Sequence, residues 1–270
     1  MKISSTISLG APLRAATLLR GDIFDCIARS VDMGFDGVEL QLNLDEGSAI
    51  DFGEVAEFCG KKGIAVSAYA TGSLYVKNGL SLIDDDPAVV DKAISRLKLY
   101  VDAAEITGGK VIIGCVRGNI PDPGEYLKLE ERFASSMGRV LDAAGQKGVG
   151  VVLEAINRYE NNYLATASQT ACFIEKYNLP LEILLDTFHM NIEERDMAAA
   201  FSAAAGHLGH VHLADNTREV PGMGSLDFSK IIGCLRGIGY DGWLSFECFI
   251  DKDEDEEAKL GLRHVKKLMD

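Results

Sequence analysis

Short apolar runs rich in β-branched residues alternate with longer amphipathic stretches along the whole chain, with no linker between them. In α/β proteins each such strand is followed by a helix that covers the sheet. Eight strand–helix units in 270 residues match the usual size of a closed barrel. The sequence therefore predicts an α/β fold, a single (β/α)8 TIM barrel that spans residues 1–270. The predicted strands are KISSTISL, DGVELQL, AVSAYA, KVIIGCV, GVVLEA, LEILLDTF, HVHLAD and WLSFEC, and the predicted helices lie near 21–34, 51–63, 87–107, 125–147, 166–178, 194–207, 227–239 and 253–269.

Local signals favour this barrel over an open doubly wound sheet. Asp51, Thr166 and Asp227 stand where helices begin and are suitable N-cap residues. No Gly-x-Gly-x-x-Gly turn follows the first strand, and the chain has no P-loop, so the usual nucleotide-binding signs of the open sheet are missing. A short internal repeat, or echo, occurs at GFDGVEL (34–40) and GYDGWLSFE (239–247). Both segments place Gly-aromatic-Asp-Gly before a predicted strand, and repeated strand starts suit a closed barrel.

The charge balance restricts the class of partner. The chain carries 41 acidic and 27 basic residues, for a net charge of −14, which repels nucleic acid and anionic membrane surfaces. The first residues show no signal-peptide pattern, and no apolar stretch reaches the length of a membrane span. We expect a cytoplasmic protein. The cysteines have no Cys-x-x-Cys spacing and predict buried thiols in a reducing compartment: Cys26, Cys59, Cys115, Cys172, Cys234 and Cys248.

Ionisable side chains stand at the ends of the last four predicted strands: Glu154, Asp186, His212 and Glu247. The carboxyl ends of barrel strands form one rim, where active sites gather. Alternate strand residues share a face, so the parity that turns Glu154 inward also turns Val152 inward, and the same parity places Leu184 below Asp186. We therefore expect three carboxylates and one imidazole to converge. His210 shares the parity of His212 but lies deeper, and we expect it to be a hydrogen-bonded interior residue.

A divalent cation explains this convergence. Three buried carboxylates repel one another strongly unless a positive charge lies among them. Oxygen ligands with one imidazole suit Mn²⁺, Mg²⁺ or Co²⁺ better than a thiolate-type zinc site, although zinc also accepts such ligands. Glu154, Asp186, His212 and Glu247 are thus the predicted metal ligands, and four protein ligands leave coordination positions for substrate.

Four segments carry a resemblance to a known family: EAINRYENN at 154–162, LLDTFHMNIEE at 184–194, HVHLADNTREVPGMGSLDF at 210–228 and SFEC at 245–248. They resemble the sugar isomerase/epimerase family of xylose-isomerase-like TIM barrels, and most closely its ketose 3-epimerase branch, typified by D-tagatose 3-epimerase. The motifs cover the second half of the chain. The first half agrees with the family only in its alternation of strands and helices.

The resemblance implies a chemistry and a role for each matching residue. It implies one divalent ion, above all Mn²⁺, held by the four ligands named above. Glu154 and Glu247 would act as the catalytic acid and base on opposite faces of a ketose, inverting C3 through a cis-enediolate. Glu160, His189 and Arg218 would contact the substrate. Relatives of this kind are commonly homodimers or homotetramers.

Other interpretations remain at this stage. The same site suits an aldose–ketose isomerase, including a hydroxypyruvate isomerase, or a pentulose- or hexulose-phosphate epimerase. A non-catalytic sugar-binding barrel is a further alternative, whereas a DNA-repair barrel conflicts with the charge and with the absence of histidine before residue 189. Each predicted substrate contact also has a structural alternative: a Glu160–Arg158 pair, a helix-capping His189 and a loop-bracing Arg218. Arg117 either reaches the rim or braces its loop, and specificity is expected around Gln41, Tyr69 and Tyr75.

Overall fold

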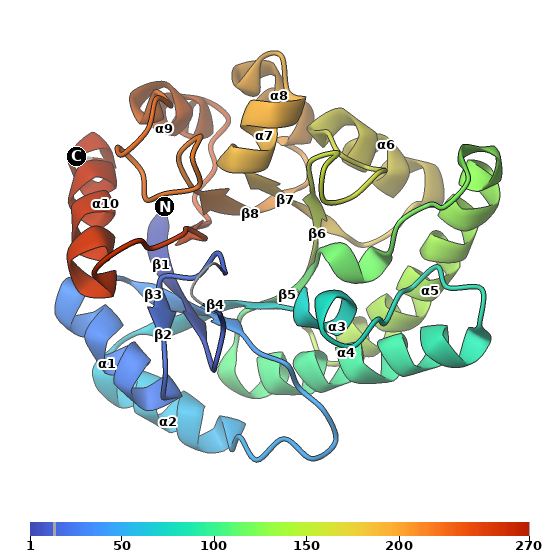
Figure 1. Ribbon diagram of the computed structural model, residues 1–270, viewed down its shortest axis with the longest axis horizontal. Coiled ribbons are helices and arrows are strands. Elements are labelled where there is room, and N and C mark those ends of the chain that lie inside the picture. Colours follow the sequence, from blue (N-terminus) through green and yellow to red (C-terminus); the bar gives the residue numbers. More distant parts are fainter. Residues whose placement is uncertain (13–14, 270) are drawn as a thin grey trace.

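Parallel strands close into a barrel in the computed structural model, which describes residues 1–12 and 15–269 (Figure 1). β1 pairs with β3 on one side and with β9 on the other, so the sheet closes on itself. The predicted (β/α)8 barrel is confirmed, with a two-residue strand, β2, added beside β1. The strands are β1 (Lys2–Ser8), β2 (Leu19–Arg20), β3 (Gly37–Gln41), β4 (Ala65–Ala70), β5 (Lys110–Ile113), β6 (Val151–Ala155), β7 (Glu182–Asp186), β8 (Leu208–Leu213) and β9 (Trp243–Phe246).

Helices surround the strands, as Figure 1 shows, and α10 packs beside α1 and α9. The main apolar core lies between these helices and the outer face of the sheet. The helices are α1 (Ile23–Met33), α2 (Phe52–Lys62), α3 (Ser73–Val76), α4 (Pro87–Thr107), α5 (Tyr126–Gln146), α6 (Ala167–Tyr177), α7 (Thr187–Glu193), α8 (Met197–Ala204), α9 (Phe228–Gly237) and α10 (Glu254–Met269), with 3₁₀ turns at Cys115–Arg117 and Pro123–Glu125. None of the helices in the described ranges combines the length and apolarity needed to cross a bilayer.

The predicted helix starts are confirmed by their capping hydrogen bonds. Asp51 accepts from two backbone amides at the start of α2, and Asp227 accepts from the Lys230 amide at the start of α9. Thr166 and Gln169 form a complete capping box at α6. Each cap satisfies backbone donors that have no partner within the helix. The starts of these three helices are thus encoded locally.

Strands β5 and β7 are shorter than predicted: the run KVIIGCV gives a strand only to Ile113, before the 3₁₀ turn at Cys115–Arg117. The run LEILLDTF suggested a strand that continues to Phe188, but β7 ends at Asp186 and α7 begins at Thr187. The Asp186 side chain ends the strand, because its Oδ1 accepts a 2.8 Å hydrogen bond from the Phe188 amide and caps α7. The helix predicted at 194–207 is also shorter than expected, since α8 covers only Met197–Ala204. The short helix α7, which directly follows β7, carries His189 at the rim of the barrel.

The barrel interior is divided between apolar and polar side chains. Ala68, Ile112, Val152 and Leu184 form a small apolar cluster inside β4, β5, β6 and β7. The predicted strand parity is therefore confirmed for Val152 and Leu184. Inside the other strands the buried residues are polar instead: Ser4, Thr6, Glu39, His210 and Ser245.

The cysteines are all free, but they are not uniformly buried. Cys26, Cys59 and Cys248 are buried as predicted, and Cys115 and Cys234 are partly exposed. The prediction is wrong for Cys172, which is exposed because it lies on the outer side of α6.

Candidate functional site

Side chains from four successive strands converge at one rim of the barrel. One atom from each lies within 4.8 Å of the others: Glu154, Asp186, His212 and Glu247. Glu154 and Asp186 lie on the last residues of β6 and β7, His212 is near the end of β8, and Glu247 directly follows β9. The backbone register pairs Asp186 on β7 with His212 on β8, which aligns the second and third of these strands. The structure thus brings together the four predicted metal ligands.

Unpartnered atoms within this group fit a cation. Asp186 Oδ2 and His212 Nδ1 are buried and have no hydrogen-bond partner, and they lie 3.9 Å apart. Their other polar atoms are already occupied: Asp186 Oδ1 caps α7, and His212 Nε2 lies 3.1 Å from Glu39 Oε2. A buried polar atom without a partner is costly, so these two atoms are suited to binding a cation between them. A divalent ion bound by oxygen and one imidazole nitrogen fits this donor set.

The pKa values of the three carboxyl groups show how strongly these buried charges interact when no cation is bound. Burial, followed by the nearby Glu247 carboxylate, raises the pKa of Glu154 to about 8. Burial also raises the pKa of Asp186 to about 6. Burial acts to raise the pKa of Glu247 too, but the positive charges of His212 and Arg218 outweigh it and lower that pKa. The site therefore favours added positive charge.

Arg218 lies among these carboxylates rather than only bracing its loop. Its Nη2 donates to Glu247 Oε2 at 2.5 Å and lies 3.6 Å from Asp186 Oδ2, while Nη1 lies 3.4 Å from Glu160 Oε1. The guanidinium carbon lies 4.7 Å from the centre of the Phe188 ring, in a cation–π contact. Arg218 has a φ of +63°, which is rare for a residue with a side chain and is typical of functional positions.

His189 and Glu160 are joined by Asn157. The Asn157 amide nitrogen donates to Glu160 Oε1 at 3.1 Å and lies 2.6 Å from His189 Nδ1. Because an amide nitrogen only donates, His189 Nδ1 accepts and Nε2 carries the proton. His189 Nε2 lies 3.5 Å from Glu154 Oε1, so this N–H faces the metal group. Arg158 pairs with Glu193 instead, which excludes the alternative Glu160–Arg158 pair.

A cavity of about 420 Å³ lies over the candidate metal ligands. This volume suits a small molecule of the size of a sugar. The cavity is lined by all three predicted substrate contacts and by three of the four predicted metal ligands: Glu154, Glu160, His189, His212, Arg218 and Glu247. Asp186 is fully buried behind them.

Comparison with known proteins identifies the family of this barrel. A sequence model described as the xylose isomerase-like TIM barrel matches residues 27–268, which is most of the chain. The chain belongs to this family. The family assignment agrees with the closed barrel and with the rim at which the site lies.

Relatives of this xylose isomerase-like barrel include sugar epimerases. The chain is 35% identical over 184 residues to the L-ribulose 3-epimerase of Methylomonas sp. strain DH-1, a match that covers 67% of this chain and 64% of that protein's length. It is also 35% identical over 227 residues to the ketose 3-epimerase of Arthrobacter globiformis, covering 83% of this chain and 76% of the relative. A solved structure of L-ribulose 3-epimerase superposes with a TM-score of 0.83 at 28% identity, covering 99% of this chain and 94% of that one.

Arg117 of this xylose isomerase-like barrel braces the site from behind. It is fully buried, and its Nε donates to Asn161 Oδ1 at 2.9 Å. Its Nη1 donates to the Glu154 backbone oxygen at 2.5 Å, and its guanidinium packs on the Tyr163 ring. The structure thus favours loop bracing over a position at the rim. The residue fixes both Glu154 and the loop that carries Glu160.

Of the three residues around which specificity is expected, the structure places Gln41 at the cavity and Tyr69 and Tyr75 away from it. Gln41 lines the cavity, and its Nε2 donates to Glu247 Oε1 at 3.0 Å. Tyr69 points outward from β4, where its hydroxyl lies 2.5 Å from Thr107 Oγ1 on α4, because Ala68 and Ala70 take the inward positions. Tyr75 lines a separate cavity and accepts a hydrogen bond from Asn119.

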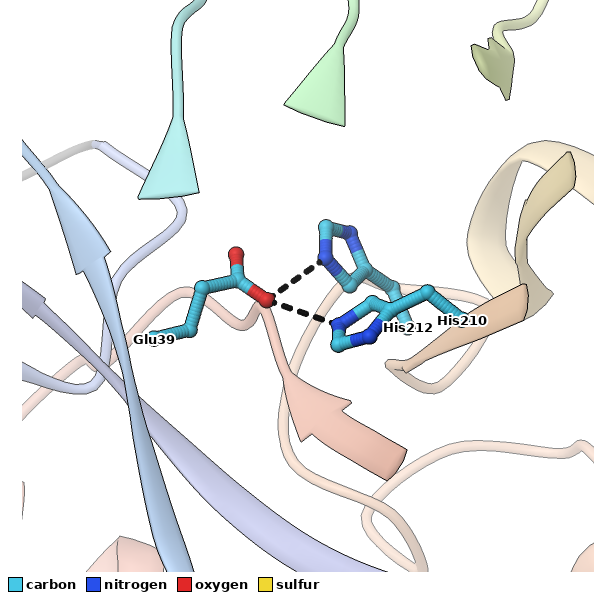
Figure 2. Close-up of side chains that lie close together, drawn as sticks. All are labelled: Glu39, His210 and His212. Carbon is cyan, nitrogen blue, oxygen red and sulfur yellow. Dashed lines mark hydrogen bonds and ion pairs between the residues drawn. The ribbon is translucent and has the colours of Figure 1, made fainter. Parts of the chain in front are cut away.

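Glu39 is the site residue that the sequence analysis missed. It lies on β3, and its Oε2 contacts His212 Nε2 at 3.1 Å from inside the barrel (Figure 2). The internal echo was a usable signal, because both copies place a glutamate in or directly after a strand, Glu39 in one and Glu247 in the other. His210 is hydrogen-bonded in the interior, as expected, to Glu39 and Ser245.

The protonation of Glu154 predicts how the stability of the metal-free protein depends on pH. The folded state keeps this proton up to about pH 8, whereas the unfolded chain releases it near its ordinary pKa of 4.5. Between these values the folded state binds more protons, so stability falls as pH rises. Metal-free protein should therefore melt at a lower temperature at about pH 8 than at about pH 6.5, as measured by circular dichroism. A Glu154→Gln variant should show a smaller decline, and an unchanged melting temperature in the unsubstituted protein would contradict the assignment.

Proposed function

We propose that this protein is a metal-dependent ketose 3-epimerase, which interconverts the C3 epimers of a small ketose. The observation that carries the proposal is the placement of two carboxylates, Glu154 and Glu247, at one cavity and within one candidate metal group. The printed activities of the relatives, L-ribulose 3-epimerase and ketose 3-epimerase, support the same reaction. We also propose that the protein acts in the cytoplasm and forms a homodimer or homotetramer.

Glu154, Asp186, His212 and Glu247 would hold one divalent ion, with Mn²⁺ the expected metal and Mg²⁺, Co²⁺ or Zn²⁺ the alternatives. When bound, the ion would supply Lewis acidity to the oxygens on C2 and C3 of the ketose, making the C3 hydrogen more acidic. Four protein ligands would leave coordination positions on the ion for oxygens of the substrate.

The proton transfers fall to the chain's own carboxylates. One of Glu154 and Glu247 removes the C3 proton, and the other delivers a proton to the opposite face of the same carbon. The bond broken on one face is replaced by a bond on the other, so the configuration inverts and no oxidant is needed. Two separate carboxylates are required, because a single base would return the proton to the face from which it came.

Arg218 and His189 would bind the C2 oxygen. The Arg218 guanidinium carries positive charge into the site, and the His189 Nε2–H faces the same group. Donors placed where negative charge develops lower the barrier to proton removal. Glu160 would hold these two donors, because it accepts from Arg218 and is joined to His189 through Asn157.

The cavity favours an unphosphorylated sugar. The arginine and lysine side chains that line it, within the described residues, are Arg218 and Lys77. Arg218 already faces three carboxylates, which leaves exposed Lys77 as the free positive charge. A phosphate monoester carries up to two negative charges and is usually bound by several donors. We therefore propose a free ketose as substrate.

Proton exchange in D₂O tests the proposed reaction. Metal-loaded protein is incubated with a panel of free ketopentoses and ketohexoses, and the products are read by NMR. The expected result is deuterium at C3 together with a new C3 epimer. Deuterium at C1 or C2 of an aldose–ketose pair would contradict the proposal and support isomerisation. Binding of a ketose without any exchange would instead support a sugar-binding barrel.

A further inference from the structure

A buried acid lies beneath the candidate metal centre. Glu39 is fully buried inside the barrel, and its Oε2 lies 3.1 Å from His212 Nε2 and 2.9 Å from His210 Nε2. Figure 2 shows both imidazoles pointing their Nε2 atoms at this one carboxylate oxygen. Glu39 comes from β3, on the side of the barrel away from the strands that supply the metal group.

This contact determines which nitrogen of His212 faces the metal group. A carboxylate only accepts hydrogen bonds, so His212 Nε2 must donate its proton to Glu39. An imidazole binds a metal in its neutral form, so the ion would take the place of any proton on the other nitrogen, Nδ1, while Nε2 keeps its own. Nδ1 lies 3.5 Å from Glu247 Oε2 and 3.9 Å from both Asp186 Oδ2 and Glu154 Oε1, and it has no hydrogen-bond partner.

We propose that Glu39 is the positioning residue of the metal centre. It fixes the tautomer and the ring orientation of His212, so that Nδ1 is presented to the ion together with the three carboxylates. Glu39 itself does not touch the substrate cavity and acts only through His212. The inference rests on the proposed metal-dependent function, which it deepens by adding a residue from the first half of the chain.

Neighbouring polar side chains hold Glu39 in place. His210 Nε2, which contacts Glu39, also lies 2.9 Å from Ser245 Oγ. Ser245 Oγ lies 2.5 Å from Ser4 Oγ, which in turn accepts from Ser67 Oγ at 3.0 Å. These contacts join β3, β8, β9, β1 and β4 across the barrel. A buried network of this kind rigidifies its members, so the carboxylate is held at a fixed depth below His212.

The main alternative is a second metal ion bound by Glu39, His210 and His212, whose ligand atoms also lie within 4.8 Å of one another. Three features favour hydrogen bonding instead. Both imidazole contacts to Glu39 Oε2 have ordinary hydrogen-bond lengths, and His210 has a further partner in Ser245. Neither Glu39 nor His210 is among the residues that line the cavity, so these two side chains lie away from the space open to substrate. The positioning role therefore predicts one ion per chain.

Metal affinity tests the role of Glu39. Mn²⁺ is titrated by calorimetry into the metal-free protein, its Glu39→Gln variant and a Ser67→Ala control. Ser67 belongs to the same buried network but does not contact His212. Substitution of a residue that orients a metal ligand usually weakens metal binding by about 10–100-fold. We expect that loss for Glu39→Gln, and a change within about 2-fold for Ser67→Ala. Equal affinity of Glu39→Gln and the unsubstituted protein would overturn the inference.

A measurement on the unsubstituted protein avoids dependence on the folding of the variant. With ¹⁵N-labelled histidine and diamagnetic Zn²⁺, two-bond ¹H–¹⁵N NMR reports the state of each ring nitrogen. We expect His212 to bind the ion through Nδ1 and to keep a proton on Nε2. A His212 that is bound through Nε2, or a stoichiometry of two ions per chain, would overturn the inference while leaving the proposed function intact. If the protein binds no ion at all, the metal-dependent function and the inference are both wrong.

Discussion

Replacing Glu247 with glutamine is expected to lower kcat for C3 epimerisation by about 10²–10⁴-fold, the usual contribution of a general acid or base. Glutamine keeps one acceptor oxygen, which can take the hydrogen bond that Arg218 donates to Glu247 now, although its amide nitrogen cannot accept from Gln41. It cannot exchange a proton at the pH of the reaction. The loss should therefore appear in kcat and in deuterium uptake at C3, with a smaller effect on KM.

An exposed glutamate provides the matched control for this prediction. Glu131 is exposed on α5 and does not line the cavity, so Glu131→Gln should retain the activity of the unsubstituted protein. Both variants are compared by steady-state kinetics and by melting temperature. Full turnover by a folded Glu247→Gln variant would remove Glu247 from the proton transfer and require another base.

Removal of the metal is the second prediction with a large effect. The ion is proposed to supply several kcal/mol of stabilisation to the developing charge, so chelation should lower the turnover rate by about 10³-fold, or about 4 kcal/mol. Loss of a ligand that binds only the folded state also lowers stability, by about 2.7 kcal/mol when the ion had been present at 100 times its Kd. Adding Mn²⁺ back should restore both turnover and melting temperature.

An Asp186→Asn variant separates metal loss from side effects of the chelator. Asp186 is fully buried behind the cavity lining, and its Oδ1 caps α7 while Oδ2 faces the group. Asparagine can keep the cap through its oxygen, so the variant should fold but bind Mn²⁺ more weakly. Metal analysis must confirm the ion content of each sample. Undiminished turnover in protein shown to be metal-free would contradict the proposed chemistry.

Local patterns in the sequence were sufficient to predict the barrel and the placement of the four converging residues. Strand parity turned Val152 and Leu184 into the barrel, and the same parity applied to Glu154 and Asp186 at the strand ends. Capping residues such as Thr166 located the helices, because their hydrogen bonds lie within a few residues of chain. Each of these features depends on short-range geometry that a sequence displays directly.

Features that depend on distant contacts were harder to predict. Glu39 lies 173 residues from His212 in the sequence, and only closure of the barrel brings the two side chains together. The early start of α7 depends on one capping bond from Asp186, which a run of apolar residues concealed. Tyr69 faces away from the cavity because successive residues of β4 alternate in direction, and the small residues Ala68 and Ala70 face inward.

Anomalous diffraction from crystals of the Mn²⁺-loaded protein tests the central claim most directly. The account predicts one manganese peak per chain, bound by Glu154, Asp186, Glu247 and the Nδ1 atom of His212. A peak between Glu39 and His210 in its place, or fully loaded crystals with no peak at the rim, would contradict it.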